Sequence, residues 1–262
     1  MLVAGVDIGS STAKSVIMEN STIVSTAFIP TGPSSAETAS KVLQKALDVK
    51  SLSMKELAYI VSTGYGRISV PFAGKTITEI SCHAKGIVSI FPEVRTILDM
   101  GGQDCKAIQC DEHGNVQNFL MNDKCAAGTG RYFERISAAL GVPLEDIGPL
   151  SMQIVEGPAT ISSFCTVFAQ FDVVMLLRQG NHHNDILAGV CEAMAERIQV
   201  LIKRIGLIPD FSITGGVAKN IGVVKRLERD LEMKTCIAPE PLIVGALGAA
   251  LFAQDLAMKE SD

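Results

Sequence analysis

The strongest constraint on the fold is a pattern that occurs twice. Residues 7–14 (DIGSSTAK) and 99–106 (DMGGQDCK) both read D-x-G-x-x-x-x-K. Each copy follows an apolar run and leads into a second run, a turn and a third run, which indicates strands joined by hairpins. No Pro-, Gly- or Ser-rich linker separates the copies near residue 95. We therefore expect two related halves that face each other across a cleft.

Strand-like apolar runs alternate with helix-period segments along the chain, which predicts an α/β fold. Strands are expected at residues 2–7, 14–18, 23–28, 58–62, 96–100, 105–110, 116–121, 211–214 and 234–237, and helices at 36–49, 79–91, 130–140, 164–178, 185–205, 217–231 and 243–257. In the duplicated arrangement, residues 1–94 with 243–262 form the first half and residues 95–242 form the second.

Composition excludes several classes of protein. Of 262 residues, 47% are hydrophobic and 19% charged, so the chain folds into a packed core. The net charge of −5 gives no general attraction to nucleic acid. The N-terminus does not resemble a secretory signal, and the longest apolar run, 241–253, is shorter than the roughly 20 residues that span a bilayer. We expect a cytoplasmic protein without a membrane or nucleic-acid partner.

The two repeated loops predict a bound Mg-nucleotide, because glycine lets backbone N–H groups approach a phosphate closely. Asp7 and Asp99 are expected to hold Mg²⁺ through its water shell, and Gln103 to orient an attacking water. The other loop residues expected at the nucleotide are Gly9, Ser10, Ser11, Thr12 and Lys14 in the first copy, and Gly101, Gly102 and Asp104 in the second. A single D-x-G is a common turn at a strand end, but the repeat favours the functional interpretation.

Two further glycine elements extend the predicted nucleotide site. Gly215, Gly216, Val217 and Asn220 follow a short strand and are expected near the base and ribose. The segment Gly128, Thr129 and Gly130 precedes a helix, whose N-terminal N–H groups are expected to face an anion. The chain contains no Walker loop. Together, these loops resemble those of the actin, Hsp70 and sugar-kinase superfamily.

Two of the seven cysteines, Cys125 and Cys165, lie at predicted helix starts. A helix N-terminus favours the thiolate that binds metal. No C-x₂-C occurs, so one chain lacks the ligand set of a ferredoxin-type cluster. Spacing alone leaves both structural and metal-binding roles open.

The chain as a whole closely resembles the ATP-dependent activators of 2-hydroxyacyl-CoA dehydratases, a family that includes ATPase subunits of benzoyl-CoA reductases and reductases of double-cubane cluster proteins. The resemblance is carried by residues 61–67, 81–84, 99–106, 121–131, 165–169 and 214–220, and the string NDKCAAGTGR within 121–131 is highly specific. The resemblance implies a duplicated actin-like ATPase fold.

It also implies a homodimer with one bridging [4Fe–4S] cluster, to which each chain gives Cys125 and Cys165. A reduced ferredoxin or flavodoxin would supply the electron, and an iron–sulfur enzyme would accept it after ATP acts. Cys105, Cys110, Cys191 and Cys236 are better interpreted as core residues, and Cys82 beside His83 as a packed pair. The chain has Gln170-Phe171-Asp172 where dehydratase activators usually have Glu-Ser, which leaves the identity of the partner enzyme open.

Two other classes share such loops. A small-molecule kinase is one, because Asn122-Asp123 mimics the pair that holds the general base in sugar kinases. In those kinases the pair precedes the second phosphate loop, whereas here it follows. A filament-forming actin homologue is the other, and it leaves Cys125 and Cys165 unexplained.

Overall fold

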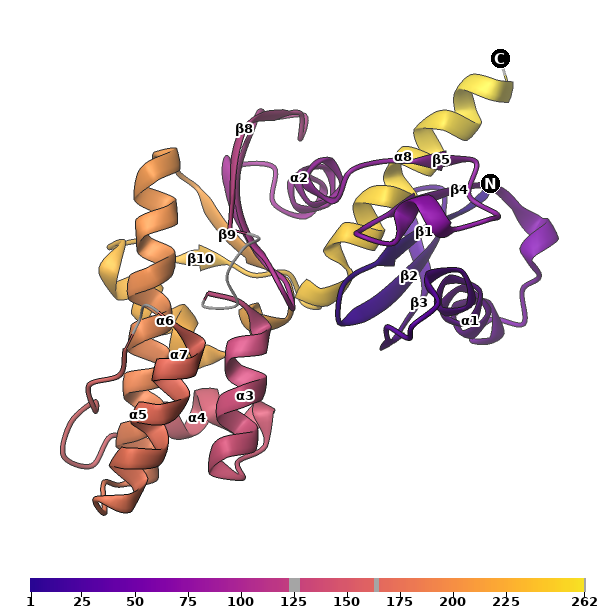
Figure 1. Cartoon of the computed structure of the whole chain (residues 1–262). Helices are drawn as coiled ribbons and strands as arrows, with labels where there is room; N and C mark the ends of the chain where they lie inside the picture. The colour runs from indigo at the N-terminus through magenta and orange to yellow at the C-terminus, as the bar shows by residue number, and fades with distance from the viewer. Residues whose placement is uncertain (123–127, 163–164, 262) are drawn as a thin grey trace.

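A computed structural model of the chain describes residues 1–122, 128–162 and 165–261. It contains two five-stranded sheets (Figure 1). The first has the order β3-β2-β1-β4-β5, with β1 Leu2–Ile8, β2 Thr12–Glu19, β3 Thr22–Pro30, β4 Leu57–Thr63 and β5 Lys75–Thr76. The second has the order β10-β9-β6-β7-β8, with β6 Thr96–Met100, β7 Cys105–Cys110, β8 Val116–Asn122, β9 Phe211–Thr214 and β10 Thr235–Cys236. The predicted duplicated α/β fold is confirmed.

The repeated pattern folds into the same hairpin in both sheets. Asp7 lies opposite Lys14 in the β1–β2 pair, and Asp99 lies opposite Lys106 in the β6–β7 pair. The turns also match, because the N–H of the pattern glycine donates to the carbonyl three residues later, at 3.1 Å in the first copy and 3.0 Å in the second. The pattern therefore specifies a cross-strand Asp–Lys pair at the end of each central strand.

Helices cover both faces of each sheet. They are α1 Ser35–Asp48, α2 Glu79–Ile90, α3 Gly130–Leu140, α4 Ile147–Ser151, α5 Thr166–Arg178, α6 His183–Ile205, α7 Ile221–Asp230 and α8 Val244–Ser261. Helix α1 packs on the face of the first sheet that includes Val6, and α8 packs on the face that includes Val3. Helix α2 packs on the second sheet near Ile97, and helices α3, α6 and α7 pack on its other face near Leu98.

Short 3₁₀ segments complete the chain at Met54–Glu56, Arg67–Ser69, Leu144–Asp146, Gly216–Lys219 and Pro241–Ile243. The helix expected at 217–231 is interrupted. Residues Gly216–Lys219 form one of these 3₁₀ turns, and α7 starts afresh because the Asn220 side chain accepts a hydrogen bond from the Val223 N–H at 3.2 Å. Helix α5 also starts later than expected, at Thr166, so that Cys165 is its N-cap residue.

Helix α8 closes the first half on the opposite side of the sheet from α1, next to β1 (Figure 1). The helical stretch Pro241–Glu260 is apolar and long enough to cross a membrane by length and composition, which the sequence interpretation did not anticipate. However, 67% of its apolar window is buried inside the protein, as expected for a core helix. Its close approach to β1 depends on Gly5, since a Cβ there would meet the backbone of Ala246 and Ala250.

Gly5→Ala is expected to push α8 off the sheet and to lower the free energy of unfolding by about 2 kcal/mol through overpacking. Chemical denaturation of the full chain measures this loss. Gly157→Ala is the matched control, because a Cβ at Gly157 meets no atom within 4 Å. Equal stability of the two variants would contradict the predicted close contact.

Candidate functional site

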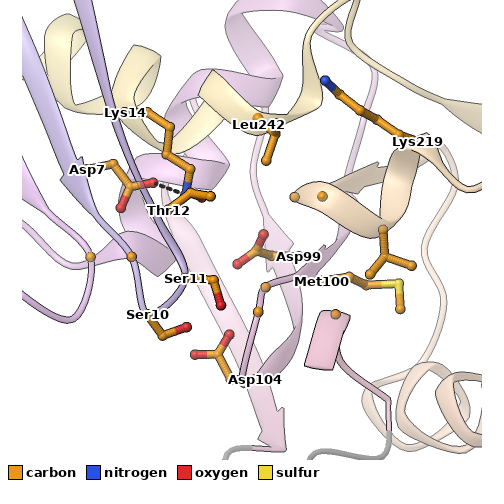
Figure 2. A pocket seen from close by; sticks show the side chains of 18 of the residues that line it. Asp7, Ser10, Ser11, Thr12, Lys14, Asp99, Met100, Asp104, Lys219 and Leu242 are labelled. Carbon is orange, nitrogen blue, oxygen red and sulfur yellow. Dashed lines mark ion pairs between the residues drawn. The ribbon is translucent and has the colours of Figure 1, made fainter. Parts of the chain in front are cut away.

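Residues from both sheets line a cavity of about 370 Å³. That volume lies within the range of about 300–1,000 Å³ found for small-molecule sites. Fifteen predicted site residues meet there: Asp7, Gly9, Ser10, Ser11, Thr12, Lys14, Asp99, Gly101, Gly102, Asp104, Gly130, Gly215, Gly216, Val217 and Asn220. Figure 2 shows the two hairpin turns facing each other across this space, with Ser10 and Ser11 on one side and Asp104 on the other.

Four predicted site residues with described positions lie outside the cavity lining: Gln103, Gly128, Thr129 and Cys165. Gln103 belongs to the second loop, but its side chain is exposed. Cys125 and Asp123 lie outside the described residues. The structure therefore assembles the phosphate loops and the third glycine element, and places the cysteine helix start elsewhere.

Charged side chains cluster at the base of the cavity. The Lys14 Nζ lies 3.2 Å from Asp7 Oδ2 (Figure 2). The Lys106 Nζ is 2.7 Å from Asp104 Oδ1, 3.5 Å from Asp99 Oδ2 and 3.9 Å from Glu79 Oε1, while only 2% of its side chain is exposed. Burying an ammonium group is costly unless carboxylates surround it. The cavity base is thus an acidic pocket with two internal lysines.

The pKa shifts follow from this arrangement. Burial alone would lower the pKa of Lys106, but the carboxylates of Asp99 and Asp104 outweigh burial and raise it. Burial alone would raise the pKa of Asp99, but His83 and Lys106 outweigh burial and lower it. Both Asp99 and Lys106 are therefore charged at neutral pH.

Two buried oxygens at the facing loops, Ser11 Oγ and Asp104 Oδ2, have no hydrogen-bond partner among the described residues. Buried polar atoms are normally paired, so these two fit a ligand that brings donors or a hydrated cation. The two loops also approach closely, because a Cβ on Gly102 would meet the Ser11 hydroxyl and lie 2.7 Å from Ser11 Cβ. These features fit a nucleotide phosphate with its Mg²⁺.

No group of three or more His, Cys, Asp or Glu side chains in the described part of the chain could hold a metal ion by itself. This suits Mg²⁺, which usually keeps several waters and binds to one or two carboxylates plus substrate phosphates. Asp7 and Asp99 are the carboxylates that would hold it here, because each is the next-to-last residue of the central strand of its sheet and lines the cavity.

The third glycine element forms a tight turn against the second loop. Gly215 has a φ of +82°, and a Cβ there would meet the Met100 carbonyl oxygen, so both conformation and space require glycine. The apolar residues Phe133, Leu144, Val217 and Leu242 line the cavity on this side. They can pack against a planar base.

The first N–H groups of α3 do not have the role expected from the sequence, which was to face an anion. The Gly130 N–H donates to the Gly101 carbonyl and the Arg131 N–H donates to the Gly102 carbonyl, both at 2.9 Å. These N–H groups are therefore bonded to the second phosphate loop and are not directed at an anion. The loop and the first turn of α3 form one hydrogen-bonded unit.

The sequence interpretation missed several lining residues, above all Glu79, His83 and Lys106. Lys106 could have been found, because it ends the second copy of the pattern just as Lys14 ends the first. For His83 the sequence predicts a packed pair with Cys82. The structure buries both residues, but turns the imidazole toward Asp99, with Nε2 at 3.5 Å from Oδ1.

The described cysteines separate into two groups. Burial raises the pKa of the thiols of Cys82, Cys105, Cys110 and Cys191, to about 12 for Cys82 and about 11 for Cys110 and Cys191, so these thiols stay protonated. Cys236 is only partly buried, in contrast to the expected core position, and burial also raises its pKa. Cys165 is half-buried, free, and at the N-cap of α5.

Two sheets with matching Asp–Lys hairpins around one cavity define an actin-like ATPase fold. Residues 4–253 match the BadF/BadG/BcrA/BcrD ATPase family, and the chain belongs to that family.

Several relatives match the chain over all or most of its length. The chain is 44% identical over 261 residues to the activator of lactoyl-CoA dehydratase of Anaerotignum propionicum, covering 99% of this chain and 100% of that protein. It is 34% identical over 212 residues to a benzoyl-CoA reductase subunit of Thauera aromatica, covering 79% and 74% of the two chains. The solved activator of the 2-hydroxyisocaproyl-CoA dehydratase from Clostridium difficile with bound ADPNP has a TM-score of 0.95 and 40% identity, covering 100% and 97%. The resemblance inferred from the sequence is confirmed.

Gly102→Ala is expected to separate the two facing loops and to weaken ADP binding about tenfold, since overpacking costs of the order of 1–3 kcal/mol. Isothermal titration of ADP into the full-length protein measures the change. Gly157→Ala serves again as the control with open space around the new Cβ. Wild-type affinity in Gly102→Ala would show that the loops do not meet around the ligand.

Proposed function

We propose that the protein is an ATP-dependent electron-transfer activator: a homodimer that couples ATP binding and hydrolysis to delivery of a low-potential electron to an iron–sulfur partner enzyme. The observation that carries the proposal is the hydrogen-bonded connection between the second phosphate loop and α3. Helix α3 follows the Cys125 segment and contacts α5, whose N-cap residue is Cys165. A change at the nucleotide can thus reach both cysteine-bearing segments.

In the nucleotide step, Asp7 and Asp99 would hold Mg²⁺ through its water shell, and Lys14 would face the phosphates. Gln103 is exposed outside the cavity lining, so its role in orienting the attacking water requires the second loop to carry it inward. Two observations support this assignment. Ser11 Oγ and Asp104 Oδ2 have no hydrogen-bond partner in the part of the chain that the structure describes, and a relative with 40% identity binds ADPNP.

The conformational step requires that nucleotide states differ in affinity for two arrangements of the halves. We assign residues 1–94 with 243–262 to one half and residues 95–242 to the other. The packing of α8 on Val3 and Val61 supports this division. A hinge between the halves would then alter the surroundings of Cys125 and Cys165.

Cys125 and Cys165 would hold a [4Fe–4S] cluster shared by two chains, two thiolates from each. The cluster supplies one-electron chemistry when bound. Cys165 is the N-cap residue of α5, so the N–H dipoles at this helix end face an anionic group such as an iron–sulfur cluster. Asp172 Oδ2 accepts a hydrogen bond from the Ser162 N–H at 2.8 Å, which ties the segment leading to Cys165 to α5. This gives the unusual Gln170-Phe171-Asp172 sequence a local role.

The homodimer is supported by the outer surface of α5. Val167, Phe168 and Phe171 lie within the first two turns after Cys165, with exposed fractions of 58%, 62% and 63%. Isolated exposed apolar residues are ordinary, but a cluster beside a candidate ligand indicates an interface. We propose that a second copy covers this cluster and contributes the other two thiolates.

The partner would be a 2-hydroxyacyl-CoA dehydratase, an enzyme of the benzoyl-CoA reductase type or a double-cubane cluster protein, with ferredoxin or flavodoxin as electron donor. Activators of dehydratases and a reductase component among the relatives support this class. A cytoplasmic, oxygen-sensitive protein follows from the same proposal.

Anaerobic reconstitution with iron and sulfide is expected to give a brown protein with about four irons per dimer, the content of one cluster. Cys125→Ala and Cys165→Ala should abolish iron binding, whereas Cys110→Ala, which removes a buried strand thiol, should preserve it. Iron analysis and visible absorption measure this. A colourless wild type, or equal iron loss in all three variants, would refute the proposal.

Phe171→Asp is expected to place a charge in the dimer interface and to give a monomer that holds no iron but still binds ADP. Sedimentation and iron analysis under anaerobic conditions measure both effects. Phe119→Asp is the matched control, because Phe119 is also a phenylalanine with a large exposed fraction, 46%, but lies on β8. A Phe171→Asp protein that remains dimeric and brown would place the interface elsewhere.

A further inference from the structure

One buried side chain at the site, His83, remains without a role. It lies on α2, with 6% of its surface exposed, and its Nδ1 is 3.0 Å from Thr214 Oγ1. Its Nε2 is 3.5 Å from Asp99 Oδ1. Buried polar side chains are normally hydrogen-bonded, and this imidazole lies between a fully buried hydroxyl and a buried carboxylate.

The hydrogen-bond directions follow from the proton inventory. Thr214 Oγ1 donates to Asp99 Oδ1 at 3.0 Å, since an ionised carboxylate only accepts. A threonine hydroxyl has a single proton, so toward His83 the same oxygen must accept. The network therefore assigns a proton to Nδ1, and the order of donation is His83 to Thr214 to Asp99.

This chain of hydrogen bonds fixes the orientation of the Asp99 carboxylate. Oδ1 is held by Thr214, and Oδ2 is 3.5 Å from Lys106 Nζ. With both oxygens engaged, rotation about the carboxylate bond would break one of these contacts. A carboxylate that holds a cation through water needs such orientation, because outer partners of metal-binding groups tune metal affinity.

A glycine on the neighbouring helix α8 also leaves space for the imidazole. A Cβ on Gly245, in the first turn of α8, would lie 2.9 Å from His83 Nε2 and 3.2 Å from Asp7 Oδ2. Because residue 245 is glycine, there is room for the edge of the His83 imidazole beside Asp7. His83 lies between the acidic residues of the two halves, on a helix that contacts α8 and the second sheet.

We propose that His83 is a positioning residue that, through Thr214, orients Asp99 for the nucleotide-bound divalent cation. This inference rests on the proposed role of Asp99 in holding Mg²⁺. His83 itself does not bind the cation or the nucleotide. It acts by keeping Thr214 as a donor to Asp99.

The test measures Mn²⁺ binding by electron paramagnetic resonance to the anaerobically purified full-length protein saturated with ADP. His83→Leu and Thr214→Val are expected to raise the Mn²⁺ dissociation constant about tenfold or more, the loss typical of removing an outer partner of a metal ligand. His83→Asn places an amide N–H near the position of Nδ1 and is expected to recover most of the affinity. Thr214→Ser, which keeps the hydroxyl, should do the same.

Ile87→Val is the control for stability, because Ile87 is a fully buried apolar residue on the same helix. A Mn²⁺ affinity of His83→Leu or Thr214→Val within about twofold of the control would overturn the inference, since an orienting partner is worth more than that. Equal losses in His83→Leu and His83→Asn would also overturn it, because only packing would then matter.

Failure of the proposed function has a different signature. Asp99→Asn with wild-type Mn²⁺ affinity would remove the metal role of Asp99 and the basis of the proposed nucleotide step. A large loss in Asp99→Asn together with wild-type affinity in His83→Leu would overturn only the role of His83. A double variant His83→Leu/Thr214→Val no weaker than either single variant would support one shared pathway to Asp99.

Discussion

The cross-strand pair of aspartate and lysine at the end of each central strand is the contact on which the rest of the structure depends. In each half the antiparallel register sets Asp7 against Lys14 and Asp99 against Lys106. A buried ammonium group such as that of Lys106 is tolerated only where carboxylates enclose it. In both copies the turn folds the lysine back beside its aspartate. The loops, the cavity and the charge at its base follow from this one requirement.

The loop residues of the two copies nevertheless differ, and the two loops therefore suit different parts of a bound nucleotide. At the last turn position the first copy has Thr12 and the second has Asp104, and the intervening residues are Ser10 and Ser11 against Gly102 and Gln103. The first loop thus offers hydroxyl and N–H donors suited to phosphate oxygens. The second offers a carboxylate and a very small residue, suited to a hydrated cation and to close approach by the first loop.

The sequence predicted the fold well because the pattern is local and repeated, and β6, β7 and β9 have their expected bounds. The predictions from the sequence were wrong where contacts between distant parts of the chain determine the local structure. Asn220 interrupts a helix because its side chain caps the next one, and the N–H groups of α3 bond to loop carbonyls that the sequence does not place nearby. His83 was missed because α2 and Thr214 are far apart in sequence, and only the folded chain brings the imidazole to the hydroxyl.

Helix α8 has a consequence for how the protein is made. It follows β1 and β2 late in the chain, yet Val3 and Val16 on these strands share one core cluster with Ala246 and Ala250 of α8. During synthesis the first sheet therefore stays bare on one face until α8 has also been made. Such long-range closure slows folding and leaves apolar surface open to chaperones or to aggregation in the meantime.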